Sequence, residues 1–275
     1  MKEGLFLVAI FYLAYTKLVN GQPRKDCQTR CGNFTVEYPF GTSPGCFYPE
    51  DNSFNLTCNE KEELLFGHKP VINISLSGQL RIRERRSKVC YDSQGKLTGS
   101  RARRTSVDNF TLSDHNKFTV VGCNSYAFLR TSGAENYSTG CMSMCDSVPT
   151  KKGSCSGEGC CQTPVPRGSS LVRVIPNSFD NHTTVHQFNP CTYAFLVEDN
   201  EFNFSASDDL KNLRHVKRFP VLLDWSIGNQ TCEQVGSTSI CGGNSTCLDS
   251  TPRNGYICRC NEGFDGNPYL SAGCQ

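Results

Sequence analysis

The chain has 275 residues, of which 18 are cysteine, and its formal net charge at pH 7 is +2. An even and dense set of cysteines is typical of a secreted protein with a disulfide framework and argues against a reducing, cytosolic setting. Hydrophobic residues make up only 37% of the chain, so we expect thin cores that depend on those disulfides.

Residues 1–21 have the pattern of a secretory signal peptide. Lys2 gives a positive start, residues 5–15 form an unbroken apolar run, and small or short residues precede Gln22. The apolar run is too short to span a bilayer, so cleavage before Gln22 is favoured over the alternative of an uncleaved anchor. No later apolar run approaches the length of a membrane span.

Residues 27–58 contain four cysteines around two β-like runs, 34–38 and 54–56, which are separated by the turn sequence Tyr-Pro-Phe-Gly. By themselves they indicate an oxidised, turn-rich module. The order Cys-Gly-Asn, Tyr-Pro-Phe-Gly, Gly-Cys and Phe-x-Leu-x-Cys resembles the galacturonan-binding domain of plant wall-associated receptor kinases. That resemblance implies pectic galacturonan as the ligand, and we assign residues 22–110 to this domain.

Glycosylation is predicted by Asn-x-Ser/Thr sequons spread through the mature chain. Occupied sequons must be exposed, so they also indicate where large binding faces do not lie. The nine sites are Asn33, Asn55, Asn73, Asn109, Asn136, Asn181, Asn203, Asn229 and Asn244.

Residues 70–104 form a strongly basic zone with nine cations and two acids, whereas the remainder of the chain sums to −5. Residues 78–83 alternate apolar and charged positions, which predicts a half-buried strand with its arginines on one face. The candidate ligand-binding residues are Arg81, Arg83, Arg85, Arg86, Lys88, Lys96, Arg101, Arg103 and Arg104.

Three interpretations of the basic zone remain open from the sequence. It is a solvated surface, a dibasic processing site at residues 101–104, or a site for a polyanion. Several guanidinium groups suit a polymer with one carboxylate per sugar, since each can bind a carboxylate with two hydrogen bonds. Nucleic acid fits the charge alone, but a secreted glycoprotein rarely meets it. The family resemblance points independently to galacturonan.

A second cysteine-rich segment occupies residues 111–228. Its Cys155-to-Pro166 stretch, its Cys191-to-Val197 run and Phe219–Trp225 resemble the second extracellular segment of the wall-associated kinases. The twelve cysteines of residues 27–191 can close on themselves, and we expect a bridge between the two segments, although the connectivity stays open. The adjacent Cys160 and Cys161 are expected to bind different parts of the chain. The single Trp225 is interpreted as a packing residue rather than a sugar-stacking platform.

Residues 229–275 resemble an EGF-like module, through a Cys-x-Cys pair followed by a glycine-aromatic turn. Acidic residues are missing before its first cysteine, so no EGF calcium site is expected, and calcium would enter only through pectate. The resemblance implies the pairs Cys232–Cys247, Cys241–Cys258 and Cys260–Cys274.

Each enzyme-like motif in the sequence lacks a group that its chemistry requires. The GxSxG-like string at residues 41–45 places Pro44 after its serine, and proline lacks the N–H that an oxyanion hole needs. His182 and His186 have metal-ligand spacing but lack the glutamate of a metalloprotease. Disulfide pairing also leaves no thiol as nucleophile. We therefore expect no catalysis and no cofactor.

The sequence thus predicts an all-β, disulfide-rich fold that binds cell-wall pectin outside the cell. The resemblance implies either the sensing ectodomain of a receptor kinase or a truncated soluble form; full members continue into a membrane helix and a kinase domain. The alternative is a secreted structural glycoprotein that binds other wall proteins through its EGF-like module and has no carbohydrate ligand.

Overall fold

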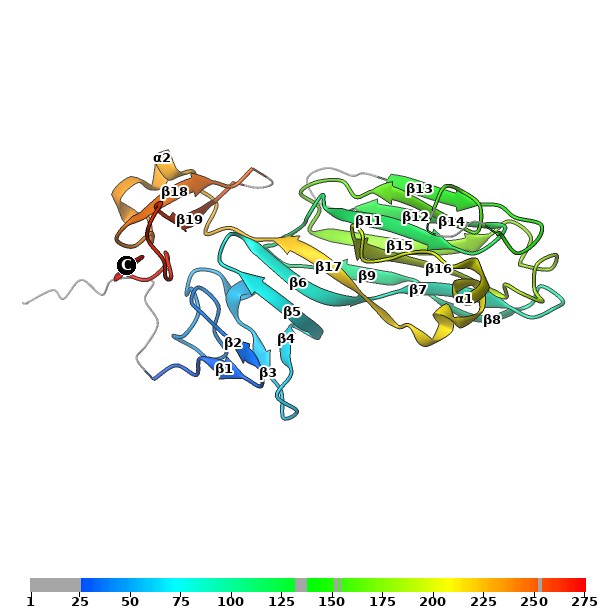
Figure 1. Ribbon diagram of the computed structural model, residues 1–275, viewed down its shortest axis with the longest axis horizontal. Helices are drawn as coiled ribbons and strands as arrows, with labels where there is room; N and C mark the ends of the chain where they lie inside the picture. The colour runs from blue at the N-terminus through cyan, green and yellow to red at the C-terminus, as the bar shows by residue number, and fades with distance from the viewer. Residues whose placement is uncertain (1–25, 132–137, 151–152, 154, 252–253) are drawn as a thin grey trace, which may run out of the picture.

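The computed structural model describes residues 26–131, 138–150, 153, 155–251 and 254–275. The predicted all-β, disulfide-rich fold is confirmed: every pair of adjacent strands is antiparallel, and the described helices are short. The molecule is elongated, with the N-terminal strands and the C-terminal module at one end and a β-sandwich at the other (Figure 1).

The N-terminal end contains a small ribbon and a six-stranded sheet. The ribbon consists of β1 (Arg30–Cys31) and β2 (Phe34–Thr35). The sheet has the order β10 (Thr111–Leu112), β17 (Arg218–Asp224), β6 (Gln79–Arg85), β5 (Lys69–Ser75), β4 (Leu64–Phe66) and β3 (Thr57–Cys58).

The β-like runs expected near the N-terminus are shorter in the structure. Only Phe34 and Thr35 of the first run form a strand. The second run begins inside a 3-10 turn at Asn52–Phe54, because the Asp51 side chain accepts a hydrogen bond from the Ser53 N–H at 2.8 Å and starts that turn. Local side-chain capping therefore replaced strand geometry there.

The sandwich packs a five-stranded sheet against a four-stranded sheet. The first has the order β14 (Cys160–Pro164), β11 (Asn116–Val121), β16 (Cys191–Glu198), β7 (Ser87–Tyr91) and β8 (Leu97–Arg101). The second has the order β13 (Ser138–Ser143), β12 (Ser125–Thr131), β15 (Leu171–Ser178) and β9 (Arg103–Ser106).

Strand β16 is buried on both faces, which explains its continuous apolar sequence. One face packs into the sandwich through Ala194 and Leu196. The opposite face, with Phe195, is covered by the segment around α1 (Ala206–Asn212) and by Phe219, whose ring stacks on Phe195 at 3.7 Å.

The two cysteine-rich segments share their sheets. Strands β6, β7 and β9 pair with β17, β16 and β15 of the second segment. The disulfide Cys90–Cys191 also joins the segments. Each segment closes its remaining bridges internally, as Cys27–Cys46, Cys31–Cys58, Cys123–Cys145, Cys141–Cys161 and Cys155–Cys160.

The C-terminal module contains α2 (Cys232–Val235) and a hairpin of β18 (Ser245–Asp249) and β19 (Tyr256–Cys260). Its disulfides have the pairing that the EGF resemblance implies. Tyr269 is fully buried, and its hydroxyl donates to the carbonyl oxygen of Leu76 at 2.9 Å. The module is therefore anchored on the N-terminal sheet.

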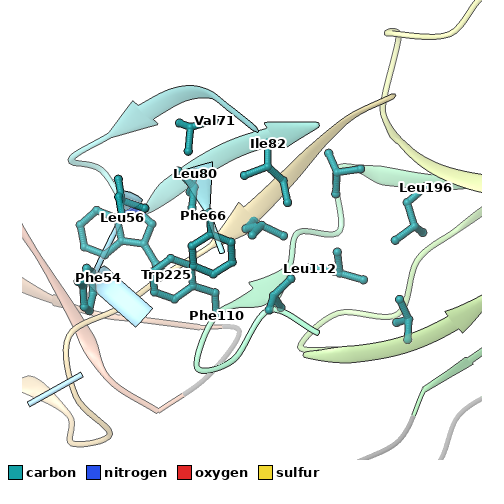
Figure 2. Packing of buried hydrophobic residues seen from close by; sticks show 14 of the residues in the cluster. Phe54, Leu56, Phe66, Val71, Leu80, Ile82, Phe110, Leu112, Leu196 and Trp225 are labelled. Carbon is teal, nitrogen blue, oxygen red and sulfur yellow. The ribbon is translucent and has the colours of Figure 1, made fainter. Parts of the chain in front are cut away.

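Trp225 is a packing residue in this core, with 3% of its surface exposed. Its ring lies 5.3 Å from Phe40, 5.5 Å from Phe54 and 5.5 Å from Tyr269. Figure 2 shows it among apolar side chains of the six-stranded sheet. It thus links the N-terminal domain to the C-terminal module, and no face of the ring is available for a sugar.

Candidate ligand-binding site

The predicted strand at residues 78–83 is confirmed as β6, with Leu80 and Ile82 inside and Arg81, Arg83 and Arg85 on the opposite face. From the end of β6 the chain passes directly into β7, turns into β8 and reaches β9 after one residue. The basic zone is therefore folded back on itself, which brings cations from four consecutive strands together.

Pairing between strands places like charges directly opposite one another. Arg85 on β6 faces Arg218 on β17, and Lys88 on β7 faces Arg101 on β8. Like charges at opposed positions destabilise a sheet. Two such pairs at one place indicate that this surface is shaped for something other than the stability of the free protein.

These pairs line a surface pocket of about 350 Å³. All the residues that line it are cationic, and none of them forms an ion pair with a carboxylate within the part of the chain that the structure describes. The lining residues are Arg85, Arg86, Lys88, Arg101, Arg103, Arg214, Lys217 and Arg218.

The Arg86 side chain links two of the segments that line the pocket. It is buried, its Nε donates to the Val216 carbonyl at 2.6 Å and its Nη2 donates to the Arg214 carbonyl at 2.9 Å. Its guanidinium also lies 4.3 Å from the centre of the Tyr193 ring. Burial lowers the pKa of Arg86, but a guanidinium stays protonated. Arg86 therefore fixes residues 214–218 beside β7.

The pocket is positively charged, and some of its hydrogen-bond donors have no acceptor among the described residues. Burial, followed by repulsion from nearby arginines, lowers the pKa of Arg103 and Arg218 from the ordinary arginine value. Arg103 Nε and Arg218 Nη1 are buried and have no hydrogen-bond partner among the described residues. Unsatisfied buried donors cost stability, and an anion that entered the pocket would relieve both this cost and the repulsion.

Five of the nine candidate residues lie in this pocket, and the others lie outside it. Arg81 is paired with Glu198 and Glu201, so its charge is largely neutralised. Arg83 is exposed on β6 and Lys96 is exposed in the β7–β8 turn. Arg104 lines a second groove, described below. A ligand-binding role for any of the nine stays a prediction.

Three cations outside the predicted basic zone, Arg214, Lys217 and Arg218, complete the pocket. A signal for them was present, because residues 211–218 contain four lysines and arginines and one histidine. Their partnership with residues 85–103 could not be inferred, because it depends on the pairing of β17 with β6 across more than 130 residues of chain.

A second basic groove, of about 590 Å³, lies on the neighbouring sheet. Arg104 on β9 is directly opposite Arg173 on β15, which is in turn opposite Arg130 on β12. These three side chains form one row across three strands. We call this set the arginine row, and Arg103 lines both the groove and the pocket.

The sequon asparagines that the structure describes lie outside both basic surfaces. Eight of the nine asparagines are exposed, as glycan attachment requires, and none of them lines the pocket or the groove. Asn136 lies outside the described residues.

Two further features concern the described residues only. No group of three or more acidic, histidine or cysteine side chains among them is arranged to hold a metal ion. Their helices are too short and polar to cross a membrane.

Comparison with known proteins gives two family matches. The family described as wall-associated receptor kinase galacturonan-binding matches residues 27–87, and the family described as wall-associated kinase matches residues 152–233. No solved structure matches the chain significantly.

Among curated proteins, the chain is 72% identical to wall-associated receptor kinase 2 and 59% identical to wall-associated receptor kinase 1, both of Arabidopsis thaliana. Both matches cover 100% of this chain, which spans 38% of the length of either relative. The matched part is the extracellular region of these receptors, which carries no kinase domain. The chain belongs to the wall-associated receptor kinase family, and it corresponds to the extracellular region of those receptors.

Proposed function

We propose that this chain binds de-esterified galacturonan of the cell wall and serves as the ligand-sensing ectodomain of a wall-associated receptor kinase. The observation that carries the proposal is the pocket lined by eight cations without a paired carboxylate in the described chain. The match to a galacturonan-binding family over residues 27–87 supports the same ligand class.

The chemistry of the polymer fits the pocket. De-esterified galacturonan carries one carboxylate per sugar, and a guanidinium can bind a carboxylate with two parallel hydrogen bonds. The exposed Arg85, Arg101 and Lys217 would make the first contacts at the rim, while the buried donors of Arg103 and Arg218 would be satisfied inside.

Affinity in this arrangement comes from repetition. One exposed ion pair contributes only about 0–1 kcal/mol, so a single galacturonate would bind weakly. Several carboxylates on one chain act at high effective concentration, so binding should strengthen with oligomer length. Calcium can act in either direction, because it cross-links pectate and also competes for its carboxylates.

The test is a triple substitution at the pocket rim, Arg85→Gln, Arg101→Gln and Lys217→Gln. Each of these side chains is exposed, so the substitutions remove three charges without disturbing the core. We expect the affinity for a de-esterified galacturonan oligomer, measured by isothermal titration calorimetry, to fall at least tenfold.

The matched control removes three exposed cations that do not line the pocket, through Arg30→Gln, Lys61→Gln and Arg259→Gln. It has the same net charge as the rim variant. If the two variants lost the same affinity, only the net charge would matter. If neither lost any, the pocket would not be the galacturonan site.

A further inference from the structure

The outer face of the four-stranded sheet carries exposed aromatic side chains that the basic pocket does not use. On β12, Tyr126, Phe128 and Arg130 point outward, and they alternate with the buried Ala127 and Leu129. Phe128 is 40% exposed, although a large apolar side chain gains stability from burial. Phe128, Arg130 and Arg173 on this face are exposed, so no described element covers them.

The aromatic rings are in contact and form one surface. The ring of Tyr126 lies 4.6 Å from that of Phe179 and 5.7 Å from that of Phe128. We call these three residues the aromatic platform. Phe179, at the end of β15, is 52% exposed. Two exposed rings joined by the half-buried ring of Tyr126 differ from the scattered single apolar residues of an ordinary surface.

Gly140 keeps the platform open. It lies directly opposite Phe128 on β13, and a Cβ atom at this position would stand 3.3 Å from two carbons of the Phe128 ring. Any larger side chain would therefore press on the ring or cover it. The absence of a side chain at Gly140 leaves one edge of Phe128 accessible.

The arginine row lies beside the platform on the same face. Arg130 is two residues after Phe128 on β12, and its guanidinium is 6.0 Å from the centre of that ring. Arg173 and Arg104 continue the row across β15 and β9 along the groove of about 590 Å³. A ligand on this face would meet aromatic rings first and positive charges one step further along β12.

We propose that the aromatic platform binds the uncharged, methyl-esterified sugar units of a partly esterified galacturonan whose free carboxylates bind the arginine row. The proposal rests on the proposed function, which it extends from fully charged to mixed polymers. The apolar C–H face of a pyranose suits the face of an aromatic ring. A free carboxylate does not, because the face of the ring is negative and dehydrating the charge is costly. A methyl ester avoids both costs.

The arginine row indicates that the ligand must also carry negative charges. Arg104, Arg130 and Arg173 have no carboxylate partner within the described residues. They repel one another at opposed positions, so free carboxylates would be bound there with relief of repulsion. The face therefore selects a chain that carries esterified and free units side by side.

The experiment compares two oligomers of equal length, one fully de-esterified and one about half methyl-esterified. The test variant is Tyr126→Ala with Phe128→Ala, and the control is Phe264→Ala, an exposed aromatic side chain of the EGF-like module. We expect the test variant to lose about tenfold in affinity for the half-esterified oligomer and less than twofold for the de-esterified one. The control should lose neither.

A second variant preserves the aromatic platform and adds a fluorescent probe to it. Trp225 is the only tryptophan and is buried, so Phe128→Trp adds an exposed fluorophore. We expect it to retain affinity for the half-esterified oligomer and to shift its emission to shorter wavelength on binding. No shift at a saturating concentration of that oligomer would overturn the proposal.

The outcomes separate this inference from the proposed function. If the wild-type protein bound neither oligomer, the proposed function itself would fail. If it bound the de-esterified oligomer while the platform substitutions changed neither affinity, the platform proposal alone would be wrong. The platform proposal would also be overturned if the wild-type protein sedimented as a dimer that Phe128→Ala dissociated, because the face would then bind a second copy of the chain.

Discussion

Lys88 and Arg101 face each other directly across β7 and β8, and their side chains line the same pocket. Two cations at opposed positions repel, so the sheet keeps an unfavourable pair at its edge. A surface that is unfavourable in the free protein and favourable beside an anion is the recurrent feature of this molecule. It appears again at Arg85 and Arg218 and in the arginine row.

Relief of this repulsion gives a prediction about stability. Arg101→Gln should raise the free energy of unfolding of the free protein by about 0.2–1 kcal/mol at low salt, while it weakens galacturonan binding. Chemical denaturation at two salt concentrations measures the first effect, which should shrink as salt screens the repulsion. Lys96→Gln, in the exposed turn of the same hairpin, is the control and should change neither quantity. A destabilised Arg101→Gln protein would contradict the repulsion argument.

A comparison of the adjacent Arg85 and Arg86 tests which of the two stabilises the fold. Arg86→Gln should lower the free energy of unfolding by about 2 kcal/mol, because it breaks buried, charged hydrogen bonds to the carbonyls of Arg214 and Val216. Arg85→Gln should not lower the free energy of unfolding, because Arg85 is exposed and lies opposite the like-charged Arg218, but it should weaken binding. Thermal unfolding and ligand titration on both variants provide the comparison. Equal stability losses in the two would refute the assignment.

The pH dependence of stability follows from the turn at residues 180–184, where the buried His182 ring lies 2.8 Å from the Thr192 hydroxyl. Burial lowers the pKa of His182 to about 4, below its ordinary 6.5. Burial raises the pKa of Asp180, but hydrogen bonds from Thr184, Asn124, the His182 N–H and Ser178 outweigh this and lower it to about 2. In both cases the unfolded chain binds the proton more readily than the folded one.

Stability should therefore be complete above pH 6.5, decline between pH 6.5 and 4 as His182 is titrated, and decline further toward pH 2 with Asp180. The histidine contribution is on the order of 3 kcal/mol. His182→Gln should flatten the profile between pH 6.5 and 4, whereas the exposed His215→Gln should not. Denaturant midpoints measured across this range provide the test. An unchanged slope in His182→Gln would show that another group is responsible.

The anchoring of the EGF-like module depends on the Tyr269 hydroxyl, which donates to the Leu76 carbonyl and accepts from the Cys258 N–H at 3.1 Å. Tyr269→Phe keeps the ring but leaves these groups without a partner, at a cost of about 1–3 kcal/mol. We expect a lower melting temperature and faster proteolysis at residues 228–231, where the module begins. Tyr91→Phe, on a half-exposed ring, serves as the control. Unaltered proteolysis in Tyr269→Phe would mean that ring packing alone holds the module.

The sequence predicted what local patterns determine. Alternation at residues 78–83 located β6, and the EGF resemblance of residues 229–275 implied the three cysteine pairs that are present there. The all-β, disulfide-rich fold was also predicted correctly. The expected strand at residues 54–56 was wrong, because the Asp51 cap starts a 3-10 turn there. The pattern of apolar residues in so short a run does not reveal a hydrogen bond from the Ser53 N–H to the Asp51 side chain.

The site was only half predictable for a related reason. Net charge along the chain located residues 81–104, but it could not show that Glu198 and Glu201 neutralise Arg81 or that Arg86 is buried under Tyr193. It also could not bring Arg218 beside Arg85, because sheet pairing between distant strands is not encoded in any local pattern. The arginine row was missed for the same reason, since Arg130 and Arg173 are isolated cations in the sequence.

The salt dependence of galacturonan binding tests the central claim most directly. The affinity of the wild-type protein for a de-esterified oligomer should fall steeply between about 0.1 M and about 1 M salt, over which the Debye length shrinks from about 10 Å to about 3 Å. The variant Arg85→Gln, Arg101→Gln, Lys217→Gln should bind more weakly and show a shallower slope, because fewer charges take part. Equal slopes for the two proteins, or an affinity that ignores salt, would contradict a galacturonan site built from the cations of this pocket.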